Sequence, residues 1–504
     1  MLDGEMGLLD PILFGFQTAL QWNNLLFCFI GAVIGTLIGV LPGIGPSGTI
    51  ALLLPVTLKL SPTTAIIMLA GIYYGAYYGG SITSILVNIP GEAASAVTCL
   101  DGYQMARRGR AGPALGISAM GSFIGGTLAI LGLMLIAPPT ANFALKFGPP
   151  EYFSLTVLGL VILSFMSSGP IWKSLLTASL GIFLGTIGLD SFTGIARYTL
   201  NIPQLFDGVG IVPVCMGVFG VAEILLNAEK EMKTTIYETE IKNLFPNLAD
   251  WGRSIGAILR GTIIGFFLGI LPGGGAVLAS FFSYAAERKL SKNPEEFGKG
   301  AIAGVAGPET SNNAAATSSF IPLLSLGIPA NPVMAVMIGG LMIHGVRIGP
   351  MLISEHPDLF WGTVTSMYLG NVMLLILNLP LIPMWVRILK IPYLILFPLI
   401  LLFCIVGAYS LSNSVVDVLI MIFFGLLGYF MKKFGFDAAP LVLAIVLGPL
   451  LENALKRSLI LSMGSPWIFF QRPISLVLMC AAILFLMGPA LYRQVKLKSN
   501  TGNP

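Results

Sequence analysis

Residues 39–45 read Gly-Val-Leu-Pro-Gly-Ile-Gly, and residues 269–275 read Gly-Ile-Leu-Pro-Gly-Gly-Gly. Each stretch interrupts a long apolar run with proline and glycine, the residues that break a helix. Hydrocarbon cannot satisfy the backbone groups that a break frees, so such backbone must be buried in protein or line a polar cavity. A matched pair of breaks in the two halves of a chain therefore indicates a binding site in a membrane carrier.

The composition is that of an integral membrane protein. Of the 504 residues, 55% are hydrophobic and only 10% are charged, whereas soluble domains carry about 25% charged residues. The mean hydropathy is +0.88. Because apolar runs of about 20 residues recur along the chain, we predict an all-α polytopic membrane protein with roughly 10–12 transmembrane helices, broken or re-entrant ones included. The five cysteines show no paired spacing, so neither disulfides nor a metal site is predicted.

Further matched motifs indicate that the chain contains a duplication. Asn-Ile-Pro-Gly at 88–91 is matched by Gly-Ile-Pro-Ala at 327–330, and Arg-Ala-Gly-Pro at 110–113 by Arg-Ile-Gly-Pro at 347–350, in the same order. Parallel and inverted repeats both fit these motifs. The predicted organisation is a first membrane repeat at 1–226, a polar inter-repeat linker at 227–260, a second membrane repeat at 261–472, and an extra C-terminal helix with a basic tail at 473–504.

The two glycine-rich breaks form the first candidate site. Glycine lets backbone N–H groups face a ligand without a Cβ, and a helix that restarts after a break presents its positive end to an anion. Small residues also mediate close helix crossings in membranes, but the duplication favours a functional interpretation. The predicted binding residues here are Gly43, Gly45, Ser47, Thr49, Gly273, Gly274 and Gly275.

A polar island at residues 307–319 forms the second candidate site, with a predicted counterpart at residues 77–84. Unpaired polar groups in lipid each cost several kcal/mol, so these must face protein, water or a ligand. An extramembrane loop is the alternative, and the apolar flanks argue against it. The predicted substrate- or ion-binding residues here are Ser81, Thr83, Asn88, Glu309, Thr310, Ser311, Asn312, Asn313 and Thr317.

Two carboxylates, Glu92 and Glu309, lie in otherwise uncharged segments. Intramembrane acids are candidate proton carriers or cation ligands, but an acid beside proline or glycine also caps helix starts. We weigh capping and ion coupling equally for Glu309 and favour capping for Glu92. His344 is interpreted as a hydrogen-bonded residue at the end of an apolar run.

The charge balance of the two breaks predicts a coupled transport mechanism. Neither glycine-rich loop contains Lys or Arg, and a helix start supplies only about half a charge. A di- or tricarboxylate held there would therefore need co-bound cations, Na⁺ or H⁺, which predicts symport. The chain has no Walker A and no His-Glu-x-x-His pattern, so a membrane-embedded enzyme is the weakest alternative. A channel or ion exchanger that uses the same loops is the other.

Longer motifs carry a family resemblance. They are Gly-Val-Leu-Pro-Gly-Ile-Gly-Pro-Ser-Gly at 39–48, Asn-Ile-Pro-Gly-Glu from 88, Asp-Gly-Tyr-Gln at 101–104, Gly-Arg-Ala-Gly at 109–112, Phe-Gly-Lys-Gly at 297–300, Pro-Glu-Thr-Ser-Asn-Asn-Ala at 308–314 and Leu-Gly-Ile-Pro at 326–329. From about residue 15 to about residue 460, the chain resembles the large transmembrane subunit of tripartite tricarboxylate transporters. After Asn-Asn-Ala, where the family usually has small residues, this chain has Ala-Ala-Thr-Ser-Ser at 315–319. We interpret that departure as bearing on which substrate is bound and not on family membership.

The resemblance implies a secondary transporter of the bacterial inner membrane that imports organic acids, not an enzyme. It also implies two protein partners, a small membrane subunit and a periplasmic solute-binding protein. The chain itself is expected to lie in the lipid bilayer, and no nucleic acid is expected as a partner. No cofactor is expected beyond the coupling Na⁺ or H⁺. Carried onto this chain, the family's motifs place the site at Gly43, Gly45, Ser47, Gly273, Gly274, Gly275, Glu309, Thr310, Asn312 and Asn313.

Overall fold

The computed structural model describes residues 9–41, 45–166, 170–190, 192–229, 244–273, 275–388 and 393–500, and most of these are helical. Seven helices in this part of the chain are long and apolar enough to cross a membrane, and shorter apolar helices accompany them. The prediction of an all-α polytopic membrane protein is confirmed. One short antiparallel hairpin pairs β1 (Gly188–Leu189) with β2 (Ala196–Arg197).

The chain divides into two compact units, formed by residues 1–142 with 212–430 and by residues 143–211 with 431–504. Each unit takes segments from both halves of the sequence, so the repeat boundaries stay a prediction. Most of the predicted linker, residues 230–243, lies outside the described residues, and its last part, 248–260, belongs to helix α11 (Leu248–Ile270).

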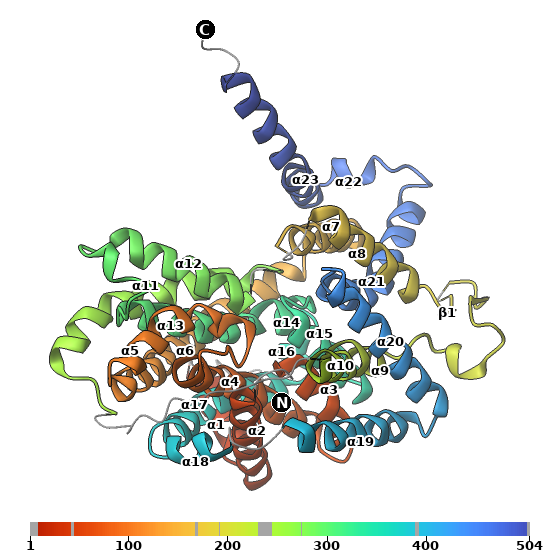
Figure 1. Cartoon of the computed structure of the whole chain (residues 1–504). Helices are drawn as coiled ribbons and strands as arrows, with labels where there is room; N and C mark the ends of the chain where they lie inside the picture. The colour runs from red at the N-terminus through yellow and green to blue at the C-terminus, as the bar shows by residue number, and fades with distance from the viewer. Residues whose placement is uncertain are drawn as a thin grey trace. The chain divides into compact units, whose positions relative to one another are not determined.

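Figure 1 shows the helices of the first unit, and local signals explain where several of them begin and end. Helices α2 and α11 both end before a proline, because Leu41 and Leu271 take the extended backbone that a following proline requires. Ser61 caps the start of helix α4, because its hydroxyl accepts the N–H of Thr64. In the first half the helices are α1 (Asp10–Ala19), α2 (Trp22–Val40), α3 (Gly45–Thr57), α4 (Pro62–Val87), η1 (Ala93–Ala96), α5 (Thr98–Arg107) and α6 (Ala111–Ala144).

The helices that follow residue 210 complete this unit. Residues 211–229 form one continuous helical run with a π-helical middle, made of α9 (Ile211–Cys215), η3 (Met216–Val221) and α10 (Ala222–Glu229). The others are α11, α12 (Gly275–Leu290), η4 (Pro294–Glu296), α13 (Ala303–Ser318), α14 (Phe320–Leu326), α15 (Pro332–Ile343), α16 (Leu352–Glu355), α17 (Pro357–Asn378), α18 (Ile382–Ile388), α19 (Tyr393–Ser412) and α20 (Val415–Lys433).

A close helix pair occurs in each half of the first unit. A Cβ added at Gly35 of α2 would lie 2.4 Å from the carbonyl oxygen of Ile72 in α4, and one at Gly265 of α11 would lie 2.1 Å from that of Ser311 in α13. Only glycine permits such backbone contact. The same close approach recurs one turn to either side, at Gly31, Gly39, Gly261 and Gly269. Each glycine-rich break therefore follows the first helix of an equivalent pair, α2 in one half and α11 in the other.

These contacts also align the later parts of the two pairs. The glycine contacts align Ile72 of α4 with Ser311 of α13, and the same sequence separation aligns Asn88 with Gly327. Asn88 ends α4 with φ 58°, and Gly327 ends α14 with φ 71°. Both residues have the left-handed backbone of a helix cap. By the same alignment, the polar island on α13 corresponds to the stretch of α4 around Ile72. The counterpart predicted from the sequence, residues 77–84, lies further toward the end of α4.

The second unit contains α7 (Pro149–Met166), α8 (Ile171–Gly185), the β hairpin, η2 (Pro203–Leu205), α21 (Ala439–Leu461), α22 (Ile468–Gln471) and α23 (Pro473–Asn500). Helices α7, α8 and α21 share an apolar cluster formed by Leu160, Ala178, Ala444 and Leu447. Helix α23 covers most of the predicted extra C-terminal segment, and residues 501–504 lie outside the described residues.

Candidate functional site

The polar island is helix α13, and every residue of that helix from Gly304 to Ser318 is buried. The structure therefore does not place it in an extramembrane loop. Helix α13 packs against α11, α12, α4 and α5, so its polar side chains meet groups from several helices.

The carboxylate of Glu309 is the centre of this buried polar network. The hydroxyl of Ser81 in α4 donates to Oε2 at 2.5 Å, and the hydroxyl of Thr98 in α5 donates to Oε1. The side-chain amide of Asn312 also donates to Oε2, at 3.3 Å. Glu309 itself is fully buried. Its partners in the described part of the chain are all neutral, so they orient a carboxylate without cancelling its charge.

Asn313 extends the network to helix α6. Its Nδ2 donates to the hydroxyl of Ser122 at 2.8 Å and to Oδ1 of Asn312 at 2.7 Å. The Ser122 hydroxyl donates in turn to the main-chain carbonyl of Glu309 at 3.2 Å. Helix α6 approaches closely because Gly121 faces Thr310, whose Oγ1 would lie 2.6 Å from an added Cβ. Four helices thus hold the site around Glu309.

Other predicted residues of the island lie beside this network but donate to main-chain carbonyls. The hydroxyl of Thr310 donates to Ala306, and that of Thr317 to Asn313. The hydroxyl of Ser311 donates to Ala279 of α12. Their hydroxyl protons are therefore committed to helix contacts. Thr83 in α4 likewise donates to Gly80, and Asn88 forms the left-handed cap of that helix.

Three described glycines of the two breaks have left-handed backbone. Gly45 and Gly275 begin α3 and α12 with φ 65° and 52°, and Gly273 has φ 80°. Glycine alone adopts such angles readily. A Cβ added at Gly45 would meet no atom within 4 Å, whereas at Gly275 it would lie 3.8 Å from Cβ of Asn331. Gly43 and Gly274 lie outside the described residues. In α3, Thr49 donates to the carbonyl of Gly45, and Ser47 is half-buried.

Sequence reasoning missed the residues that close the second break. The N–H of Gly273 donates to the carbonyl of Ala330 at 2.7 Å, which ties the break after α11 to the one after α14. Asn331 caps α15 by accepting the N–H of Met334, and its Nδ2 donates to the hydroxyl of Tyr73 at 3.0 Å. Asn331 thus joins the two halves at this point.

Glu92 occupies the equivalent cap position in the first half. Its Oε2 accepts the N–H of Ala94 at 2.6 Å, so the favoured capping role agrees with the structure. Its Oε1 is buried without a hydrogen-bond partner among the described residues. The interpretation of His344 as a hydrogen-bonded boundary residue also agrees, because its Nε2 lies 3.3 Å from the hydroxyl of Thr57.

Asp101 is a further buried carboxylate that sequence reasoning did not assign. Its Oδ1 accepts the N–H groups of Gly300 and Ala301 at 2.7 and 2.9 Å, just before α13, and its Oδ2 accepts the hydroxyl of Tyr284 at 2.9 Å. Asp101 lies one turn after Thr98 on α5. It therefore fastens α5 to the start of α13 and holds Thr98 against Glu309. The sequence signal for this contact was the presence of Asp101 and Gly300 in two family motifs, Asp-Gly-Tyr-Gln at 101–104 and Phe-Gly-Lys-Gly at 297–300.

One family model matches most of the chain. The family model described as "Tripartite tricarboxylate transporter TctA family" matches residues 25–443. An uncharacterized 52.8 kDa protein from the TAR-I ttuC′ 3′ region of Agrobacterium vitis is 52% identical over 478 residues, which cover 95% of each chain.

Two further relatives match parts of the chain. An uncharacterized protein from the TAR-II ttuC′ 3′ region of Agrobacterium vitis is 56% identical over 211 residues, 42% of this chain and 87% of that protein. An uncharacterized protein of Methanocaldococcus jannaschii is 23% identical over 275 residues, 54% of this chain and 64% of that protein. No solved structure matches the chain.

Proposed function

Because the chain belongs to the tripartite tricarboxylate transporter TctA family, we propose that it is the membrane-embedded translocation subunit of an organic-acid importer. The transported class is a di- or tricarboxylate, and a gradient of Na⁺ or H⁺ drives its uptake. A transporter, rather than an enzyme, is what the family establishes. The small membrane subunit, the periplasmic solute-binding protein and the bacterial inner membrane belong to the proposal.

The observation that supports cation coupling is that the described hydrogen-bond partners of Glu309 are all neutral. Ser81, Thr98 and Asn312 all donate to this fully buried carboxylate, and none of them carries a charge. A carboxylate without a counter-charge is costly to bury. A cation from solution, Na⁺ or a proton, would supply the missing charge there. Binding of that cation would also reduce the repulsion felt by an incoming anion.

The substrate would bind at the glycine-rich breaks. Helices α3 and α12 begin at Gly45 and Gly275, and their free N–H groups suit a carboxylate. The open space beside Gly45 supports this placement. Asn331 lies next to Gly275 and brings a side-chain amide to the second break. The cation at Glu309 and the acid at the breaks would then cross the membrane in one cycle.

Uptake by the reconstituted transporter tests this function. The chain, its small membrane subunit and its solute-binding protein are placed in lipid vesicles, and uptake of a labelled tricarboxylate is measured. We expect uptake against a gradient when Na⁺ or H⁺ is imposed outside. Uptake should fall to equilibration when an ionophore collapses that gradient. Full accumulation after the collapse would exclude a symporter, and flux that never saturates would indicate a channel.

A further inference from the structure

The second unit contains a helix that is too short to cross a bilayer beside one that is long enough. Helix α8 has 15 residues, about 22 Å, whereas the hydrocarbon core is about 30 Å thick. It runs beside the first part of α21: a Cβ at Gly181 would lie 2.4 Å from the carbonyl oxygen of Leu441, and one at Gly185 3.2 Å from that of Ile445. Helix α21 then continues past the end of α8.

Residues 186–190 and 192–206, here called the hairpin segment, continue along α21 where α8 stops. Arg197 reaches Glu452 with two hydrogen bonds, of 2.6 and 3.1 Å. Asp190 accepts a hydrogen bond of 2.5 Å from Lys456, one turn further along α21. The hairpin segment thus occupies the position that additional turns of α8 would fill.

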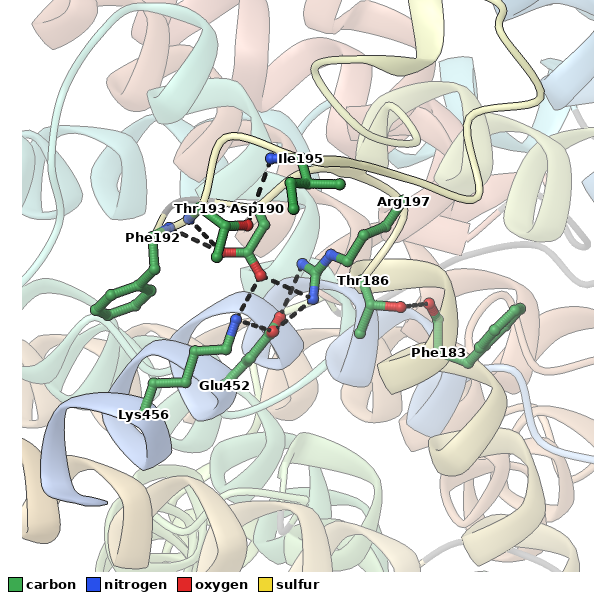
Figure 2. Close-up of polar contacts among 9 residues, drawn as sticks. All are labelled: Phe183, Thr186, Asp190, Phe192, Thr193, Ile195, Arg197, Glu452 and Lys456. Carbon is green, nitrogen blue, oxygen red and sulfur yellow. Dashed lines mark hydrogen bonds and ion pairs between the residues drawn. The ribbon is translucent and has the colours of Figure 1, made fainter. Parts of the chain in front are cut away.

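Four charged side chains at this contact neutralise one another, as Figure 2 shows. Arg197 and Lys456 each lie within ion-pair distance of both carboxylates, those of Asp190 and Glu452. We call these residues the charge quartet; its net charge is zero. Asp190 and Arg197 are also the only charged residues of the hairpin segment. All of its charge is therefore directed at α21 and balanced there.

The turn of the hairpin segment holds Asp190 in this position. Its Oδ1 accepts the N–H groups of Phe192 and Thr193 at 2.8 and 3.1 Å. The ammonium of Lys456, together with these two N–H groups, keeps the pKa of Asp190 well below its usual range. Asp190 consequently stays ionised, and the quartet stays neutral overall, at physiological pH.

The hairpin segment exposes several large apolar side chains, with Thr193, Asn201 and Gln204 exposed between or beside them. Leu200 is 82% exposed, and Ile195 is 64% exposed. Tyr198 and Leu200 have φ 55° and 51°, a left-handed backbone that is strained for these residues. The ring of Tyr198 lies 5.2 Å from that of Phe183, which joins this surface to α8. The large apolar side chains exposed on α8 are Trp172, Leu175, Leu176 and Phe183.

We propose that the hairpin segment lies in the lipid interface, with Ile195, Tyr198 and Leu200 among the lipids and the charge quartet facing α21. An exposed apolar surface that continues a membrane helix is covered by lipid at low cost. A charged residue at that depth must be paired, and both charged residues of the segment are.

The position of Leu200 can be measured with a nitroxide label. The label is placed on Leu200→Cys in the full chain, with Cys480→Ser because Cys480 is an exposed cysteine, in lipid vesicles with any subunits that co-purify. We expect collisions with oxygen to exceed those with a water-soluble nickel complex, as at Leu176→Cys on α8. Lys292→Cys, in an exposed polar loop, should show the reverse. Reversal at Leu200 would place the segment in water, and protection from both agents would place it against protein; either result overturns the proposal.

Removing one member of the quartet tests why the segment stays there. Arg197→Ala leaves two carboxylates facing only Lys456, so we expect the label at Leu200 to shift toward the nickel complex. The double variant Arg197→Ala with Glu452→Ala restores a neutral pair, Asp190 with Lys456, and should shift it back. Equal shifts in the single and double variants would show that charge balance does not hold the segment in lipid.

Discussion

Buried or partly buried carboxylates have two different kinds of partner in this molecule. Around Glu309, in the first unit, every donor among the described residues is a hydroxyl or an amide, so no positive side chain there balances the carboxylate. In the second unit, the charge quartet sets two carboxylates against two basic side chains. The difference teaches where our proposal requires a cation from solution. The quartet is balanced by its own side chains, whereas the described donors to Glu309 are all neutral.

Neutralising one carboxylate of each region gives the largest expected contrast. Glu309→Gln removes the charge that would hold the coupling cation, so we expect uptake to fall by about tenfold or more. Glu452→Gln leaves Asp190 paired with Lys456 and should cost at most about 1 kcal/mol of stability, with uptake nearly unchanged. Initial rates of labelled tricarboxylate uptake in vesicles measure both. Equal losses in the two variants would remove the distinction between the regions.

The amide of Asn313 should matter next most. Asn313→Leu leaves the hydroxyl of Ser122 and Oδ1 of Asn312 without their donor, and each buried unpaired group costs about 1–3 kcal/mol. We expect uptake to be lost and the thermal midpoint to fall. Thr262→Val is the matched control, because Thr262 is also buried, lies outside the predicted site and donates to a carbonyl of its own helix. Normal uptake by Asn313→Leu would exclude that residue from the site.

Asp101 is expected to act through Thr98 rather than on the ligand. Asp101→Ala frees α5 from the start of α13, so the cation concentration for half-maximal uptake should rise by about tenfold, as when an outer hydrogen-bond partner of a cation ligand is removed. Asp101→Asn can still accept the N–H groups of Gly300 and Ala301 and should recover most of the affinity. The cation dependence of uptake is the measurement. A fall in maximal rate alone, without a change in half-saturation, would mean that Asp101 only stabilises the fold.

The smallest effect is expected for the charge quartet when pH changes. The pKa of Asp190 is lowered in the folded chain, first by Lys456 and then by the N–H groups of Phe192 and Thr193. A lowered carboxyl pKa contributes stability above the unfolded value, about 3.9, which is lost only as pH falls below it. The label at Leu200 should therefore report the same environment from about pH 8 to about pH 5. A transition inside that range would show that the quartet is not held as described.

Local sequence signals predicted the helices and their breaks well. Proline and glycine after Leu41 and Leu271 are enough to end α2 and α11, because a residue before proline leaves the helical region. The polar island was found because so many polar groups cannot face lipid unpaired. Composition and local pattern therefore identified the all-α class and the segment that carries Glu309.

The partners of that segment could not be predicted in the same way. Thr98 lies 211 residues before Glu309, and nothing near Thr98 marks it as a donor. Asp101 appeared in a family motif, but its role follows only from its contact with Gly300 and Ala301 across the two halves. No local pattern predicted the contacts of the hairpin segment. Its two charged residues, Asp190 and Arg197, pair with residues of α21 that are more than 250 positions away in the sequence.

Thermal unfolding of the purified chain under rising cation concentration tests the role of Glu309 most directly. A cation that binds only the folded chain raises the unfolding temperature as its concentration increases. We expect that rise for the native chain with Na⁺ or with H⁺, and its absence for Glu309→Gln. An equal rise in the Glu309→Gln variant would contradict the assignment of the coupling cation to this carboxylate.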